Sequence, residues 1–191
     1  KNLGIYKTLN TFFFKTYSGL FGYDFKRSFF DDIATLERIG AKKIMDENPV
    51  HLTPNCYDFY CYKNTSLNLR WIRYLYFCQR IISNKLLKKN SVWVDIGSYY
   101  GGLQSLIYKN IPDIKIFLVD FKPQLCKSYI FLKKLFPDAK HILPDEISSI
   151  NSLSSETNSY IAYLPADKFE DHDFGKVGLL TNFFSFGEMK R

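Results

Sequence analysis

Apolar runs alternate with amphipathic stretches in the second half of the chain, and this alternation is the first guide to its fold. Four short apolar runs have the length of buried strands: 92–96, 114–119, 160–164 and 177–182. Helical patterns follow the first two runs; one ends near Asn110, and the other begins at Pro123 and stops before Pro137. Strands that alternate with helices predict a parallel sheet with right-handed crossovers. We therefore expect an α/β fold with a Rossmann-like parallel sheet over residues 91–191.

Two shorter stretches separate the second of these helices from the third apolar run. A short apolar piece at 141–143 precedes residues 148–159, whose Ser and Asn content predicts an exposed loop. The four strands are the first strands of a Rossmann sheet, and the chain ends after them. Because the chain also begins at Lys1 rather than at a methionine, we expect it to be a fragment of a longer protein.

The first half of the chain predicts an N-terminal helical extension. We expect one or two short helices in the aromatic-rich residues 1–30, followed by a helix from Asp31 or Asp32 to about Lys43. The sequence then predicts loops at 48–49 and 53–55, where Pro and Asn occur together.

The clearest helical pattern of this first half covers residues 66–82. Its apolar residues recur at steps of three and four from Leu67 to Ile82, and Ser66 is in the position of an N-cap. We therefore divide the chain into a helical, aromatic-rich region, residues 1–90, and the Rossmann-like domain that follows it.

Three arginines lie off the apolar stripe of this helix: Arg70, Arg73 and Arg80. Basic side chains on one helix suit a substrate phosphate or carboxylate. We expect a solvated helix face here, with the anion contact as the alternative.

Composition narrows the class of protein. The 191 residues are 46% hydrophobic, which excludes global disorder, and the net charge of +7 favours anionic partners, although the lysines are spread along the chain. Four cysteines without C-x-x-C spacing indicate a reduced, cytoplasmic protein. No apolar run reaches the 18 or so residues of a membrane span, so we expect no membrane-spanning segment.

The segment SVWVDIGSYYGGL, residues 91–103, joins the first strand to its helix and carries the most specific chemistry. A dinucleotide site needs G-x-G-x-x-G, but Tyr99 stands where the second glycine would be. Asp95 also ends the strand, where its charge would repel a phosphate. A ligand with a positive charge and no phosphate fits better, and S-adenosylmethionine, with its ammonium and sulfonium groups, has these properties.

Acidic residues end three successive strands and extend this interpretation. Asp95 would neutralise the amino end of the ligand, and Gly97 would let the ligand pass close to the backbone. Asp120 would accept hydrogen bonds from the ribose hydroxyls, and Asp167 would accept one from the adenine amino group. Each acid taken alone is equally typical of a helix cap.

The order D-x-G-x-x-x-G followed by two strand-end acids resembles class I S-adenosylmethionine-dependent methyltransferases. More narrowly, VWVDIGSYYGGL, IFLVDFKP, FLKKLFP and NFFSFGEM resemble bacterial sugar O-methyltransferases. The resemblance implies an enzyme that transfers a methyl group from S-adenosylmethionine to a sugar hydroxyl in polysaccharide or glycoconjugate synthesis. The residues expected to contact this cofactor are Asp95, Gly97, Ser98, Tyr99, Gly101, Asp120, Phe121, Asp167 and Asn182.

A weakly acidic sugar hydroxyl needs a base, and Glu188 is the candidate for this catalytic role. The alternative is a glutamate that interacts with a helix dipole. The three histidines are isolated, and although His172 lies among acids in FEDHDF, we expect no metal site. The expected partner is a small-molecule or glycan substrate, with or without a phosphate group, rather than a nucleic acid.

Three other functions remain open, and the first is methyl transfer to a small molecule other than a sugar. The positive charge would suit a nucleic-acid methyltransferase, but no dense basic patch and no N/D-P-P-Y motif supports it. A non-catalytic Rossmann-like module is the third alternative, with Tyr99 blocking the cofactor.

Overall fold

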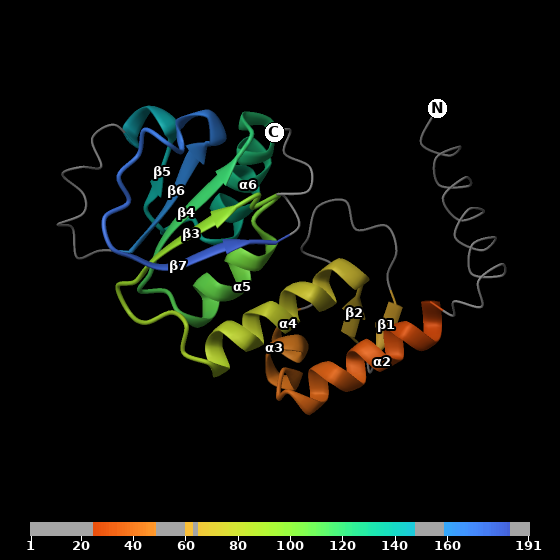
Figure 1. Ribbon diagram of the computed structural model, residues 1–191. Coiled ribbons are helices and arrows are strands. Elements are labelled where there is room, and N and C mark those ends of the chain that lie inside the picture. Colours follow the sequence, from red (N-terminus) through yellow and green to blue (C-terminus); the bar gives the residue numbers. More distant parts are fainter. Residues whose placement is uncertain (1–24, 49–59, 63–64, 148–158, 184–191) are drawn as a thin grey trace, which may run out of the picture. The chain divides into compact units, whose positions relative to one another are not determined.

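The computed structural model describes residues 25–48, 60–62, 65–147 and 159–183 (Figure 1). The chain divides into two compact units, residues 1–40 and 41–191. The second unit therefore holds the sheet together with elements that the sequence analysis assigned to the helical region 1–90. The predicted loops at 49, 53–55 and 148–158 lie outside the described residues.

One helix, α2 (Phe25–Arg38), is described in the first unit. The predicted helix from Asp31 or Asp32 to Lys43 is wrong at both ends, because α2 starts before these aspartates and stops at Arg38. Gly40 adopts a left-handed φ of +81°, and its N–H donates to the Glu37 carbonyl. A left-handed glycine ends a helix in this way.

The second unit begins with a helix, a hairpin and a second helix, and continues into alternating strands and helices. Its elements are α3 (Lys42–Glu47), β1 (Tyr60–Tyr62), β2 (Thr65–Leu67), α4 (Leu69–Ser83), β3 (Val92–Ile96), α5 (Gly102–Asn110), β4 (Lys115–Asp120), α6 (Lys122–Leu135), β5 (His141–Ile142), β6 (Tyr160–Pro165), the 3₁₀ turn η3 (Ala166–Lys168) and β7 (Val177–Asn182). β1 and β2 form an antiparallel hairpin. None of the helices in the described ranges has the length and apolar character needed to cross a membrane.

The start of α4 differs from the sequence prediction. Ser66 belongs to β2, and Asn68 is the N-cap, with its side-chain oxygen accepting from the Trp71 N–H at 2.8 Å. Because Asn and Ser are equally good N-caps, the residue types alone could not show which of the two positions begins the helix. The Trp71 indole N–H also donates to the Asn48 carbonyl at 2.7 Å, which ties α4 to the end of α3.

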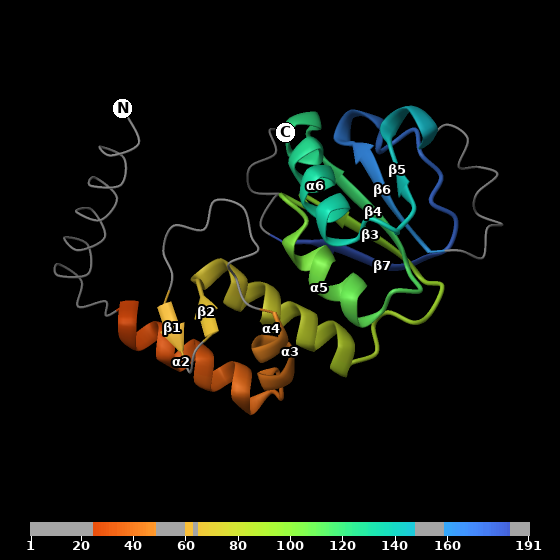
Figure 2. The ribbon, with the colours of Figure 1, turned by 180° about the vertical axis from the view of Figure 1, so that it is seen from behind.

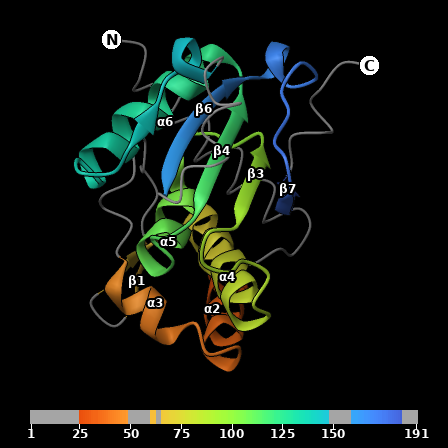
Figure 3. The same cartoon turned by 90° about the vertical axis from the view of Figure 1, so that its left-hand side faces the viewer.

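Among the described residues, the main sheet has five parallel strands in the order β5-β6-β4-β3-β7, as Figure 3 shows for the last four of them. This confirms the α/β fold with a Rossmann-like parallel sheet. The prediction of four strands is wrong by one, because His141 and Ile142 pair with β6 as an edge strand. Two residues are too few to show a strand pattern in the sequence.

The two faces of the sheet are covered differently. Helices α5 and α6 lie on one face, and α6 contacts β4 and β6 (Figure 2). On the other face a buried apolar cluster, which includes Val94, Phe117 and Leu164, packs against Phe169 and Phe174 of the β6–β7 connection.

The neighbours of β3 are β4 on one side and β7 on the other, so the strand order reverses at β3. Parallel sheets bind ligands at the carboxyl ends of the strands at such a point.

Candidate functional site

A cavity of about 350 Å³ lies at this reversal point, next to the segments that follow β3 and β4. Its size is within the range of small-molecule sites. The residues that line it come from four strand ends and from helices α4, α5 and α6: Arg70, Arg73, Tyr74, Asp95, Gly97, Ser98, Tyr99, Leu103, Gln104, Asp120, Phe121, Gln124, Ala166 and Phe183.

The turn between β3 and α5 is built from left-handed residues. Gly97, Tyr99 and Gly101 have φ angles of +77°, +55° and +88°. Gly101 is the N-cap of α5 and approaches the Leu132 side chain closely. A tyrosine in the left-handed region costs about 1–2 kcal/mol relative to a glycine. The position at which the sequence analysis noted a missing glycine is therefore one where the backbone favours glycine.

Three contacts hold Tyr99 in this conformation. Its N–H donates to the Asp120 carboxylate at 2.8 Å, and its carbonyl accepts from the Ser128 hydroxyl. The Arg70 guanidinium lies 4.5 Å from the centre of the Tyr99 ring, a cation–π contact. The tyrosine ring and the arginine together form one wall of the cavity.

Asp95 is 3% exposed and lies at the base of the cavity. Its carboxylate accepts hydrogen bonds from the Thr181 hydroxyl and from the Gln104 amide. The Trp93 indole N–H donates to Thr181 at 2.8 Å and orients its hydroxyl. Burial raises the pKa of Asp95 from 3.8 to about 7, although these hydrogen bonds oppose the rise, and the nearby Asp120 charge adds to it. A cation close to Asp95 would stabilise the ionised form of this buried carboxyl group, and the ionised carboxylate would in turn bind the cation.

Three buried side-chain oxygens around the cavity have no hydrogen-bond partner among the described residues: Ser98 Oγ, Gln104 Oε1 and Gln124 Oε1. Each belongs to a residue that lines the cavity. Buried polar atoms in folded proteins are almost always hydrogen-bonded, so these three oxygens need partners that either water or a polar ligand in the cavity can supply. Together with Asp95 and Asp120, these atoms favour a ligand rich in N–H, O–H or cationic groups.

Helix α4 adds a basic and aromatic wall that the sequence analysis assigned only as an alternative. Arg70 and Arg73 line the cavity, whereas Arg80 does not. Burial lowers the pKa of Arg70, but its hydrogen bond to Tyr99 and the nearby phenols outweigh this effect and raise it. Burial also raises the pKa of Tyr74, which keeps its hydroxyl protonated. These two arginines place positive charge at the opening of a cavity whose base is acidic.

The end of β7 completes the cavity through Phe183, whose ring stacks on Phe77 of α4 at 4.0 Å between centroids. Neither Phe183 nor Gln104, Gln124 or Thr181 was a candidate from the sequence. Their positions depend on which strand and helix lie beside β3, and a local pattern carries no signal for this.

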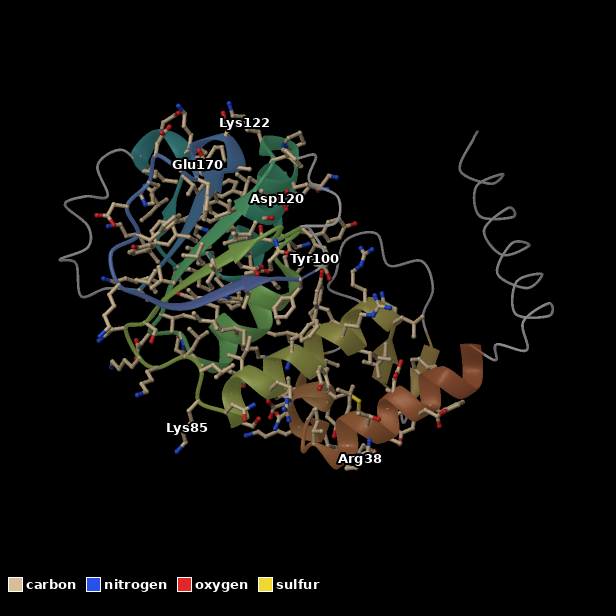
Figure 4. The ribbon with its side chains drawn as sticks, in the orientation of Figure 1. Arg38, Lys85, Tyr100, Asp120, Lys122 and Glu170 are labelled. Carbon is tan, nitrogen blue, oxygen red and sulfur yellow. The ribbon has the colours of Figure 1, made fainter. Side chains whose placement is uncertain are left out.

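The structure brings together six of the residues predicted to contact the cofactor: Asp95, Gly97, Ser98, Tyr99, Asp120 and Phe121 (Asp120 is labelled in Figure 4). Gly101 shapes the turn without lining the cavity. Asp167 is exposed in η3, and Asn182 ends β7 beside Ile96; neither lines the cavity. Glu188 lies outside the described residues.

No group of three or more His, Cys, Asp or Glu side chains in the described part of the chain is arranged to bind a metal.

Comparisons with protein-family models, with curated proteins and with solved structures found no match to this chain. The function of this chain is therefore inferred from the geometry of the cavity.

Proposed function

We propose that this chain binds S-adenosylmethionine and transfers its methyl group to a hydroxyl of a phosphate-bearing sugar. The observation that carries the proposal is the placement of two strand-end carboxylates, Asp95 and Asp120, on one cavity at the reversal point of a parallel sheet. An acidic site of this kind disfavours the pyrophosphate of a dinucleotide and suits a cationic amino acid joined to a nucleoside.

The proposed roles follow from the chemistry of each group. Asp120 has one oxygen facing the Tyr99 N–H and the other facing the Phe121 N–H, and a carboxylate with several acceptor positions can also accept hydrogen bonds from ribose hydroxyls. Asp95 neutralises the ligand's ammonium group. The unsatisfied oxygens of Ser98, Gln104 and Gln124 accept hydrogen bonds from the N–H and O–H groups of the ligand. The Phe121 side chain is 65% exposed at the edge of the cavity and offers a ring face for stacking.

When bound, S-adenosylmethionine supplies a methyl group on a positively charged sulfur. The chain's contribution is to hold this group and the acceptor hydroxyl in line and to exclude water. We propose that Arg70 and Arg73 bind the substrate phosphate, because both line the cavity and arginine recognises phosphate through paired hydrogen bonds. The base role of Glu188 and the adenine role of Asp167 stay predictions from the sequence.

Calorimetric titration of the full chain with S-adenosylhomocysteine tests the cofactor. We expect saturable binding that Asp120→Ala weakens at least tenfold. Asp138→Ala removes an exposed acid that does not line the cavity and should leave the affinity unchanged. Circular dichroism of each variant checks that it is folded. Absence of binding by the folded wild-type chain would overturn the proposal and favour the non-catalytic module.

Labelled methyl transfer to nucleotide sugars and to RNA tests the substrate. We expect transfer to a nucleotide sugar, with Arg73→Ala raising KM more than it lowers kcat. Arg80→Ala, on the same helix but away from the cavity, is the matched control. Methyl transfer to RNA but not to nucleotide sugars would overturn the proposed sugar substrate and favour a nucleic-acid methyltransferase.

A further inference from the structure

A second cavity, of about 690 Å³, lies at the opposite, amino-terminal edge of the sheet. It is bounded by the first residues of β3, β4 and β6, by the 86–91 segment that leads into β3, and by the 173–178 segment that leads into β7. Lys85, labelled in Figure 4, marks the start of the loop on this side. The two cavities have no lining residue in common, so this one is independent of the proposed methyl-transfer site.

Lys115 is the most informative residue of this cavity. It is the first residue of β4, the central strand, and it is only 7% exposed. Within the described residues its ammonium group makes no hydrogen bond and no ion pair; it lies 5.8 Å from the centre of the Tyr160 ring. A buried charge without a counter-ion is costly, and side chains of this kind are normally paired. The side chain lines the cavity, so an anion bound there would supply the missing partner.

Most of the other charged residues that line the cavity are also basic. Lys88 and Lys176 line it without an ion pair among the described residues, whereas Lys89 is paired with Asp113 at 3.0 Å. Asp173 is the one acid among the lining residues, and its carboxylate accepts the Gly175 N–H at 2.8 Å. The cavity therefore has an excess of positive charge, which attracts anions.

Apolar rings form the remaining wall and limit the class of ligand. Phe117, Tyr160 and Phe174 line the cavity, and Phe117 meets the other two rings edge-on at 5.6 and 5.1 Å. A small inorganic ion would leave this wall and most of the volume unused. A molecule that joins a phosphate to an apolar ring would use both the lysines and the rings.

From this combination we infer that the amino-terminal edge of the sheet carries a second ligand site, which binds a small phosphate ester with its phosphate on Lys115 and its ring against Phe174, the partly buried ring of this wall. Lys88 and Lys176 add to the attraction at the opening of the cavity. The site is distinct from the arginines of α4, which face the cavity at the carboxyl ends of the strands.

Titration of the full chain with phenyl phosphate, followed by NMR chemical shifts at constant ionic strength, tests this inference. We expect saturable shifts at the amides of Lys115 and Tyr160, and weaker binding of inorganic phosphate. Lys115→Met keeps a side chain of similar length against Tyr160 and should weaken binding at least tenfold. Lys176→Ala, an exposed position, should weaken it two- to fivefold without any risk to the fold.

The control is Lys127→Met, which removes an exposed charge on α6 that does not line the cavity. It should leave the affinity for phenyl phosphate unchanged, and none of the three variants should alter binding of S-adenosylhomocysteine. Equal weakening by Lys127→Met and Lys115→Met would show attraction to surface charge in general and overturn the site. Absence of saturation, or an unchanged affinity in both Lys115→Met and Lys176→Ala, would overturn it as well.

Discussion

The backbone N–H of Tyr99 donates a 2.8 Å hydrogen bond to the carboxylate of Asp120. This bond links the turn after β3 to the end of β4, and it holds a tyrosine in the left-handed backbone region, where φ is +55°. Because the Arg70 guanidinium lies on the tyrosine ring, one residue connects a strand-end acid to the basic wall of the cavity.

Substitution of Tyr99 by glycine and by alanine separates backbone strain from side-chain contacts. Both variants lose the ring, but only alanine keeps a Cβ in the left-handed region, at about 1–2 kcal/mol. The lower entropy of the unfolded alanine chain offsets part of this, by about 0.4–1 kcal/mol. We therefore expect Tyr99→Gly to be more stable than Tyr99→Ala by about 1 kcal/mol in urea unfolding. Equal stability would show that the turn relaxes around the alanine.

Asp95 should make the stability of the chain depend on pH. Its pKa is about 7 in the folded protein and near 3.8 when unfolded, so the folded state holds the proton more tightly between these values. This contribution is present below about pH 4 and is lost as the pH rises through 7. At about 1.4 kcal/mol for each pKa unit, the loss is on the order of 4 kcal/mol. Urea unfolding of Asp95→Asn between pH 4 and pH 8 should lack this decline, and an identical decline in both proteins would exclude Asp95 as its source.

The same group predicts how cofactor affinity changes with pH. If the ligand's ammonium binds only the ionised carboxylate, a pKa of about 7 makes the affinity rise about tenfold from pH 6 to pH 8. Calorimetry with S-adenosylhomocysteine at the two pH values measures this. Asp95→Asn should bind more weakly and with no such rise. A rise that persists in the variant would assign the titration to another group.

Steric crowding explains why a glycine occupies position 102, the first residue of α5. A Cβ there would lie 2.6 Å from the Tyr100 hydroxyl and 2.7 Å from Tyr74 Cε2. Tyr100 is buried and meets the Phe131 ring edge-on at 5.2 Å, so it has little room to move. We expect Gly102→Ala to lower the free energy of unfolding by about 1–3 kcal/mol. The Cβ would also lie 2.7 Å from Tyr100 Cζ, so a Tyr100→Leu background, which removes both the hydroxyl and Cζ, should reduce the cost; an unchanged cost would place the clash at Tyr74.

Local patterns were sufficient for the elements with a complete apolar run or stripe. The predicted strands 92–96 and 177–182 are confirmed as β3 and β7, and the helices on either side of β4 agree to within a residue or two. Patterns failed where an element was short or where two residues could serve equally. His141 and Ile142 were missed as a strand, and Ser66 was preferred to Asn68 as a cap.

For the cavity, the sequence by itself determined which residues end the strands and turn the chain. Asp95, Gly97 and Tyr99 were predicted from the segment 91–103, and Asp120 from the end of the next apolar run. Only the tertiary structure decided what faces them. Asp95 accepts a hydrogen bond from the hydroxyl of Thr181 in β7 and another from the amide of Gln104 in α5. The ring of Tyr99 contacts the guanidinium of Arg70 in α4. The physical reason is that strand order and helix packing are long-range choices. A hydrogen bond between residues 86 positions apart leaves no mark on the local pattern of either one.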